Sequence, residues 1–318
     1  MNLKFYFLQV PLFVAILLNV TGCRNERQVV PYEVDPDIIF KALQPNDENM
    51  PEGAAYGPEN TPGFTFDNDF VTDNNDVYIY FVDFTVLDIN PAITENLFDF
   101  ILQELDEFGF IKESDSLNPA RFNELIASGI SYKDASANLL DDIKADFERK
   151  IAADPPYGAF NINFLIYPVY LDRNYVTYRE SLYCYTGGAH GISVSYLYTY
   201  DIHTGRRLTV NDMVKKENLG EVREEVAAQM AYSYPIYENI TTVNQYLDSL
   251  NLWLEHFAPD GSDRITLQNF PLKDAAVTSE GLAFMYQMYE LTPGADGCPL
   301  VVIPYEDIKG CLKINLDK

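Results

Sequence analysis

Two long stretches with strand composition, separated by a short polar turn, constrain the fold of this chain most strongly. Residues 159–171 and 175–185 are rich in aromatic and β-branched side chains, and the turn formers of residues 172–174 separate them. Successive side chains of a strand point to opposite faces, and a short polar connection reverses the chain direction. The sequence therefore predicts an antiparallel hairpin in which Cys184 points to the opposite face from Tyr183.

Other segments predict further strands and several helices. The pattern predicts strands over 76–86, 193–201, 265–270, 277–279, 282–289 and 300–303. Helices are predicted over 91–108, 119–128, 132–151, 217–232, 242–257 and 305–312. Asn90 should cap the first helix, with Pro91 at its first position, and Gly129 should follow the second. Because strands and helices come in blocks, we expect an α+β fold with antiparallel or mixed sheets and packed helices, arranged as two sequential α/β subdomains.

The N-terminus has the residue order expected of an export signal. Lys4 precedes an apolar stretch from Phe5 to Leu18, and small residues lead to Cys23. This order resembles a bacterial lipoprotein signal, in which Cys23 is lipidated and becomes the new N-terminus; an ordinary secretory signal and a membrane anchor helix are the alternatives. We expect a protein of the bacterial cell envelope, outside the cytoplasm and held to a membrane by acyl chains.

These observations divide the chain into four parts. Residues 1–22 form the predicted signal peptide, and residues 23–63 form a predicted flexible tether rich in turn formers and poor in apolar residues. The body is expected to consist of an N-terminal α+β subdomain over 64–204 and a C-terminal one over 205–318.

The chain is strongly acidic, with 48 acidic and 22 basic residues and a formal net charge of −26. Such a surface repels nucleic acid and anionic lipids, and it attracts cationic proteins. The simpler explanation is that the charge keeps an exported protein soluble.

The candidate chemistry in the sequence is sparse. Three histidines, His190, His203 and His256, show no metal-binding spacing, and neither a serine-hydrolase motif nor a phosphate-binding loop is present. The acidic residues between Asp67 and Asp76 lack the pattern of a calcium loop, and we expect a solvated loop there. We therefore expect no catalytic residue, no metal and no cofactor.

The cysteines leave two alternatives open. Besides Cys23, the chain has Cys184, Cys298 and Cys311. Three thiols can form one disulfide with one cysteine left over, in any of three pairings, or they can remain as buried, inert thiols.

A glycine-rich loop is the most distinctive local sequence. It consists of Tyr185, Thr186, Gly187, Gly188, Ala189, His190 and Gly191. Its three glycines allow a sharp turn and a close approach of the backbone to another surface. A tight connection between two strands is the structural interpretation, and a binding loop is the functional one.

This loop is one of two motifs that carry a family resemblance. Residues 185–191 are followed by residues 200–209, with the sequence YDIHTGRRLT, and residues 289–297, YELTPGADG, are followed by residues 302–308, VIPYEDI. In this order the motifs resemble the extracytoplasmic domain pair of RsiV, the anti-sigma factor that senses lysozyme. A similar pair precedes the catalytic domain of PdaC-type peptidoglycan deacetylases.

The resemblance implies a non-enzymatic binding protein of the cell envelope. Its partner would be a lysozyme-like cationic protein or a peptidoglycan-related ligand, bound near residues 185–191, Tyr289 and Glu290. Direct control of a sigma factor is not expected, because no cytoplasmic segment is expected in a lipoprotein, and the metal-binding deacetylase module is absent. A peptidoglycan-modifying enzyme or accessory factor is the alternative, and a purely structural envelope lipoprotein is the third.

Overall fold

The computed structural model describes residues 63–72, 78–107, 119–153, 160–185, 189–257, 264–273 and 275–316. The predicted signal with Cys23 and the predicted tether up to residue 62 lie outside these residues. No helix within the described ranges is long and apolar enough to cross a membrane.

The N-terminal half builds a five-stranded sheet. Its strands, in spatial as well as sequence order, are β1 (Gly63–Thr72), β2 (Tyr78–Leu87), β3 (Phe160–Leu171), β4 (Tyr175–Tyr185) and β5 (Ile192–Asp201). All neighbours are antiparallel except β2 and β3, which run parallel. A parallel pair needs a long crossover, and the segment between these two strands supplies it as three helices.

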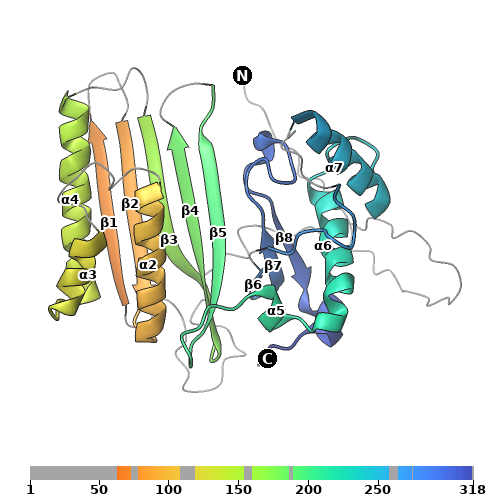
Figure 1. The fold of residues 1–318 in the computed structure, drawn as a ribbon, viewed down its shortest axis with the longest axis horizontal. Coiled ribbons are helices and arrows are strands. Elements are labelled where there is room, and N and C mark those ends of the chain that lie inside the picture. The colour runs from red at the N-terminus through yellow and green to blue at the C-terminus, as the bar shows by residue number, and fades with distance from the viewer. Residues whose placement is uncertain are drawn as a thin grey trace, which may run out of the picture.

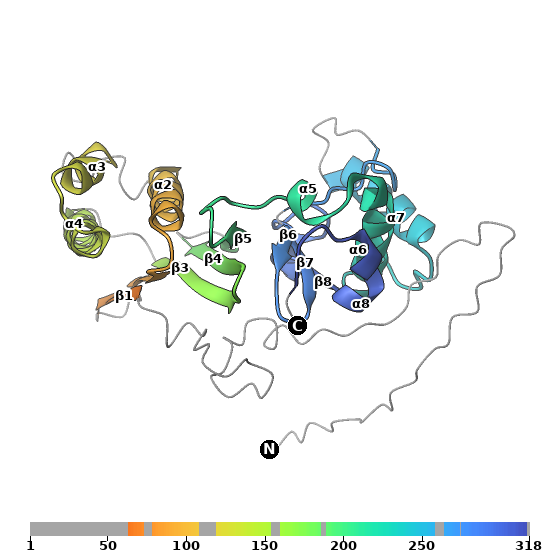
Figure 2. The same cartoon turned by 90° about the horizontal axis from the view of Figure 1, so that it is seen from below.

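The crossover helices cover one face of this sheet (Figures 1 and 2). They are α2 (Pro91–Glu107), α3 (Pro119–Ala127) and α4 (Tyr132–Ala153). Helix α2 starts as the sequence predicts, because Asn90 Oδ1 accepts a hydrogen bond from the backbone N–H of Ala92 at 3.0 Å. Alternate residues of the strands, such as Tyr178 and Tyr198, form a buried core with Ile93 and Phe98 of α2.

The C-terminal half builds a second, three-stranded antiparallel sheet. It contains β6 (Ala275–Val277), β7 (Gly281–Met285) and β8 (Leu300–Pro304), in that order. Helices α6 (Leu219–Ser233) and α7 (Val243–Phe257) pack on one face of it through a large apolar core. Shorter elements complete this half: α5 (Val210–Met213), α8 (Tyr305–Ile308) and 3₁₀ turns over Lys216–Asn218, Gly294–Asp296 and Lys309–Cys311.

The two sheets pack against each other through the faces that their helices leave uncovered. Val169 and Leu197 of the first sheet share a small apolar core with Ala283, Met285 and Val302 of the second. The molecule is therefore layered as helices, sheet, sheet and helices across strands β3–β5 and β6–β8 (Figure 2).

Buried threonines tie the two sheets together inside this core. Thr177 Oγ1 donates to the backbone carbonyl of Val277 at 2.6 Å, and Thr199 Oγ1 accepts from the Val277 N–H at 2.9 Å. The two hydroxyls lie 2.7 Å apart. Since Thr177 uses its single proton on Val277, Thr199 must be the donor between them.

The outer edge of β5 is occupied along most of its length. Cys298 Sγ donates to the carbonyl of Ser193 at 3.4 Å, and the side-chain amide of Gln287 bonds to the backbone of Ser195. Farther along, the Leu208 N–H donates to the Thr199 carbonyl at 2.8 Å. Segments from the C-terminal half thus take the place of a sixth strand.

The structure confirms the predicted α+β class and corrects several element boundaries. Residues 67–69, expected in a solvated loop, lie in β1 and pair with Asp83, Val82 and Phe81. The predicted strand over 265–270 is wrong: Asn269 Oδ1 accepts from the Thr266 N–H at 2.6 Å and folds this segment into a turn. The predicted strand over 282–289 ends at Met285, and that over 277–279 lies instead at Ala275–Val277.

Candidate functional site

The two motifs that carry the family resemblance meet in space at one end of β5. Tyr185 ends β4, while Ala189, His190 and Gly191 lead into β5; Thr186, Gly187 and Gly188 lie outside the described residues. Tyr289 and Glu290 lie in the turn after β7. The side chains of His190 and Tyr289, 99 positions apart, approach to 3.3 Å between Nε2 and the phenol oxygen.

The rings of His190 and Tyr289 contact each other, and the ring of Tyr183 lies against Gly191, next to His190; we call these three side chains the ring cluster. The rings of His190 and Tyr289 lie 6.2 Å apart at 48°, and 48% of Tyr289 is exposed. Glycine allows both tyrosine rings to lie close to backbone. A Cβ on Gly191 would come within 2.6 Å of the Tyr183 ring, and a Cβ on Gly294 would collide with the Tyr289 ring. This cluster can offer aromatic surface and a hydrogen-bonding imidazole to a partner.

Tyr289 also has an unusual backbone. Its φ is +67°, in the left-handed region that a tyrosine rarely adopts. This conformation costs free energy, and non-glycine residues in it are found disproportionately at functional sites.

Glu290 is held by the fold rather than presented with the ring cluster. Its Oε2 accepts from the Gln287 N–H at 3.0 Å, and its Oε1 pairs with Lys273 Nζ at 2.5 Å. Only 18% of its side chain is exposed. The carboxylate therefore fixes the turn that carries Tyr289.

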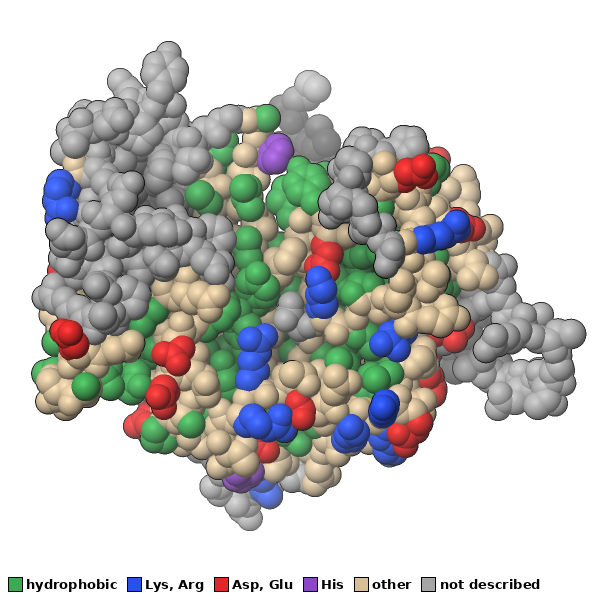
Figure 3. All heavy atoms as spheres, in the orientation of Figure 1, with side chains coloured by type: hydrophobic (Ala, Val, Ile, Leu, Met, Phe, Trp, Pro, Cys, Tyr) green, Lys and Arg blue, Asp and Glu red, His purple; other side chains and the backbone are tan. Residues whose placement is uncertain are grey.

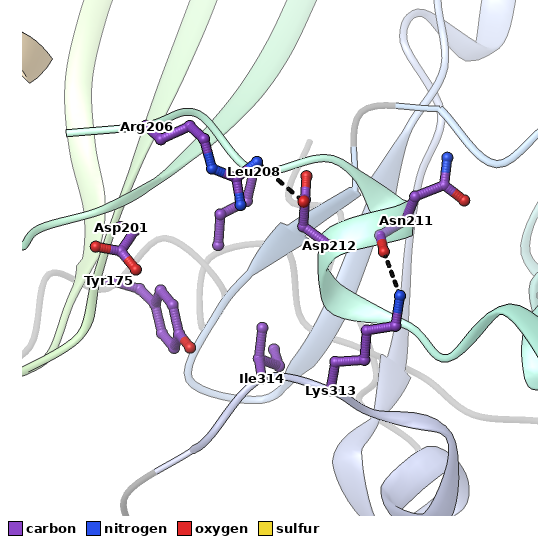
Figure 4. A pocket seen from close by; sticks show the side chains of 8 residues that line it. All are labelled: Tyr175, Asp201, Arg206, Leu208, Asn211, Asp212, Lys313 and Ile314. Atoms are coloured by element: carbon purple, nitrogen blue, oxygen red, sulfur yellow. Dashed lines mark hydrogen bonds and ion pairs between the residues drawn. The ribbon is translucent and has the colours of Figure 1, made fainter. Parts of the chain in front are cut away.

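A small pocket lies at the opposite end of β5, where the connection to α5 passes the C-terminal segment (Figure 4). Its volume is about 260 Å³. Eight residues line it: Tyr175, Asp201, Arg206, Leu208, Asn211, Asp212, Lys313 and Ile314. Three of these, Asp201, Arg206 and Leu208, belong to the motif over 200–209.

Both acidic residues of the pocket are held ionised by local hydrogen bonds. Burial opposes ionisation of Asp201, but the backbone N–H groups of Thr204 at 2.8 Å and His203 at 3.0 Å bond its Oδ1, and the net effect lowers its pKa. Burial likewise opposes ionisation of Asp212. Hydrogen bonds from Thr209 and Arg206 outweigh it and lower the pKa of this carboxyl too.

The turn before the pocket explains much of the motif over 200–209. Gly205 has φ +71°, and its N–H donates to the Asp201 carbonyl at 2.8 Å. A Cβ at this position would lie 2.5 Å from the Cβ of Ala92 in α2. Asn90 Nδ2 donates to the Ile202 carbonyl at 2.9 Å and fixes the turn to the start of α2.

Sequence reasoning did not single out Arg206, Asp212 and Lys313 as pocket residues. Thr209 and Asp212 form a capping box, with the Thr209 N–H and hydroxyl at 2.9 and 2.8 Å from Asp212 Oδ2. This spacing was a readable signal for the start of α5. The approach of Lys313 depends on the tertiary path of the C-terminal segment, for which the local sequence carries no signal.

The other candidates offer less. Cys184, Cys298 and Cys311 are free thiols, so none of the possible disulfide pairings forms. Burial raises the pKa of all three, that of Cys311 to about 11. Within the described part of the chain, no three histidine, cysteine or carboxylate side chains gather as a metal site would require. Of the acidic stretch, residues 73–76 lie outside the described residues.

Comparison with known proteins identifies a domain in the C-terminal half. Residues 212–306 match the family described as "Protein of unknown function (DUF3298)". This range covers β6–β8, α6, α7 and the turn that carries Tyr289. No curated protein matches the chain.

Two solved structures of DUF3298 family proteins align with this chain. A DUF3298 family protein from Pseudomonas aeruginosa PAO1 aligns over 80% of this chain and 94% of its own, with 16% identity and a TM-score of 0.46. A DUF3298 family member from Bacteroides fragilis NCTC 9343 aligns over 80% of this chain and 95% of its own, with 18% identity and a TM-score of 0.48.

Proposed function

We propose that this chain is a non-enzymatic lipoprotein of the bacterial cell envelope that captures a cationic, lysozyme-like protein. The ring cluster of Tyr183, His190 and Tyr289 would form the centre of the contact surface. The main support is the 3.3 Å approach of His190 and Tyr289, which joins the two segments that resemble the RsiV-like domain pair. The anchor would be a lipidated Cys23.

The chemistry of the surface fits a protein partner. Tyrosine and histidine combine apolar area with hydrogen-bonding atoms, and aromatic residues dominate the energetic centres of protein interfaces. The glycines beneath the rings and the left-handed backbone at Tyr289 fix the rings before binding, which lowers the entropy lost on association.

The net charge of −26 supports a cationic partner. Complementary charge accelerates encounter and weakens as salt screens it. The affinity should therefore fall steeply as ionic strength rises from about 0.05 to 0.5 M, because salt screens the attraction between exposed charges.

The test is a binding titration of lysozyme against the full-length chain in detergent, at low and high salt. Tyr289→Ala and His190→Ala should each weaken binding by about tenfold, as expected for central interface residues. Tyr237→Ala is the matched control, because Tyr237 is similarly exposed at 45% but lies after α6, outside the cluster. Equal affinity of all four proteins would show that the cluster is not the contact.

A parallel assay distinguishes the non-enzymatic proposal from the alternative of a peptidoglycan-modifying enzyme. The full-length chain is incubated with purified peptidoglycan, and soluble fragments and free acetate are measured. Product formation that His190→Ala abolishes would overturn the non-enzymatic proposal. The same experiment with Tyr237→Ala controls for contaminating hydrolases.

A further inference from the structure

Basic side chains are concentrated in two segments of this acidic protein. Residues 205–216 and 309–316 contain six lysines and arginines, Arg206, Arg207, Lys215, Lys216, Lys309 and Lys313, and a single carboxylate, Asp212. In the whole chain, acidic residues outnumber basic ones by 48 to 22. The local excess of positive charge is therefore a departure from the composition of the protein.

The two segments lie side by side and form one surface, which we call the basic ribbon. The Lys215 N–H donates to the Cys311 carbonyl, and the Lys313 N–H donates to the Met213 carbonyl, both at 2.8 Å. Lys215 Nζ also donates to the Gly310 carbonyl at 2.7 Å. Blue side chains gather in the lower middle of the face drawn in Figure 3.

The pocket lies against this ribbon and receives two of its cations. Arg206 enters from one side and Lys313 from the other, as Figure 4 shows. Arg206 Nη1 bonds to Asp212 Oδ1 at 2.9 Å, and Lys313 Nζ bonds to the Asn211 carbonyl at 2.7 Å. A guanidinium carries five N–H donors and an ammonium carries three, so each cation keeps donors for a ligand. The Arg206 side chain is 59% exposed and can be reached.

The acceptors in the pocket are engaged to a greater degree. Asp212 Oδ1 accepts from Arg206 and its Oδ2 accepts twice from Thr209, while Asp201 Oδ1 accepts two backbone N–H groups. The hydrogen-bonding groups that the pocket can still offer a ligand are therefore mainly N–H donors. A group that accepts hydrogen bonds is the best complement. The two cations of the lining balance its two ionised carboxylates, so the preference for a negatively charged group comes from the other lysines and arginines of the basic ribbon.

The remaining walls offer a small apolar contact beside this anion. Tyr175 and Leu208 are largely buried and, with Ile314, supply the apolar part of the lining. A volume of about 260 Å³ lies just below the ~300 Å³ at which ordinary small-molecule sites begin. The pocket therefore suits the end of a ligand rather than a whole one.

We propose that this pocket binds a carboxylate that carries a small apolar substituent, with Arg206 and Lys313 as the residues that recognise the anion. The carboxyl terminus of a peptide ending in a small residue has this chemistry, as does a short aliphatic acid. The site is separate from the ring cluster: strand β5, ten residues long, lies between them and spans about 30 Å.

Calorimetric titration of the full-length chain in detergent tests this site with three probes. They are N-acetyl-alanyl-alanine, the same dipeptide with a carboxamide end, and butyrate. The proposal expects the free-acid dipeptide to bind at least tenfold more tightly than the amide. Butyrate binding as tightly as the dipeptide would support the carboxylate site and assign it to simple acids. Equal binding of acid and amide, or no binding of any probe, would overturn the proposal.

Variants distinguish recognition by the pocket from general attraction to the basic ribbon. Lys313→Gln and Arg206→Gln should each weaken binding of the probe by about tenfold. Lys216→Gln removes a charge of the same ribbon outside the pocket lining and should change binding less than twofold. Because Arg206→Gln also removes the ion pair with Asp212, the thermal unfolding of this variant is compared with that of the wild type. If Lys216→Gln weakens binding as much as Lys313→Gln does, the result contradicts a specific site.

Discussion

Gln287 bonds to Ser195 with both ends of its side-chain amide. Its Oε1 accepts from the Ser195 N–H at 3.1 Å, and its Nε2 donates to the Ser195 carbonyl at 2.7 Å. This is the pairing that a neighbouring strand would give to β5, supplied here by a single side chain of the C-terminal half. Ser195 is 3% exposed, so water does not readily replace either bond.

Replacing Gln287 should destabilise the protein markedly. Gln287→Ala removes the partners of two buried backbone groups, and we expect a loss of roughly 2–4 kcal/mol in the free energy of unfolding. Urea unfolding followed by circular dichroism measures the loss. Glu280→Ala, in the exposed turn before β7, is the control and should change stability by less than about 0.5 kcal/mol. A Gln287→Ala variant as stable as this control would show that the pairing contributes little.

Gly205 and Gly220 should respond in opposite directions to alanine. Gly205→Ala combines a left-handed backbone with a Cβ 2.5 Å from Ala92, and we expect a loss of roughly 2–3 kcal/mol. Gly220 lies in α6 with nothing within 4 Å of its added Cβ, so Gly220→Ala should be neutral or stabilise by up to about 1 kcal/mol. Thermal unfolding of the pair decides the point, and a destabilised Gly220→Ala would contradict it.

The threonine pair between the sheets should be sensitive to loss of its hydroxyls. Thr199→Val keeps the shape of the side chain but leaves the buried Val277 N–H without its partner, at a cost of roughly 1–3 kcal/mol. Thr177→Val does the same to the Val277 carbonyl.

Because the two hydroxyls also bond each other, the effects of these substitutions should not add. A double-mutant cycle measured by urea unfolding should give a coupling of at least about 0.5 kcal/mol. Strictly additive losses would count against the network.

Asp212 should make stability depend on acid pH. Its pKa is lowered in the folded protein, so its contribution is present above the unfolded pKa of about 4 and is lost as pH falls through the folded pKa. Asp212→Asn should therefore be less stable than the wild type at pH 7, and the difference should shrink between about pH 5 and pH 2. Unfolding free energies across this range test it, with Asn211→Ala as the neighbouring control; a difference that stays constant would exclude this linkage.

Much of the fold could be predicted because its signals are local. The hairpin of β3 and β4 begins and ends within one residue of its predicted bounds, since the strand composition and the turn at Asp172 both lie in contiguous sequence. Asp172 Oδ1 accepts from the Asn174 N–H at 2.7 Å and the Tyr175 N–H at 2.6 Å, as a turn-forming aspartate does. Pro91 and Gly129 marked helix limits for the same reason.

The misplaced elements reflect interactions that the local sequence does not encode. Strand β1 was missed because aspartate and asparagine at residues 67–69 disfavour strands, whereas pairing with β2 fixes them there. Residues 265–270 have strand composition. However, the side-chain amide of Asn251 in α7 forms two hydrogen bonds of 2.7 Å with the backbone of Ile265, one to its N–H and one to its carbonyl. This contact spans 14 positions and prevents a strand.

The site divides in the same way. The loop over 185–191 and Tyr289 could be selected from their motifs, and their meeting depends on how the second sheet packs on the first. The pocket beside Lys313 forms only because the C-terminal segment returns to α5. A β-bridge between Val214 and Leu312, which are 98 positions apart in sequence, holds it there. Local sequence patterns do not predict contacts between residues so far apart in the chain.

The outer edge of β5, whose backbone groups are already hydrogen-bonded, affects how molecules can assemble. Since Cys298, Gln287 and Leu208 already engage its outward backbone groups, a strand from another molecule could not add there without displacing them. On that side the folded chain is thereby protected from stacking, strand on strand, into fibres.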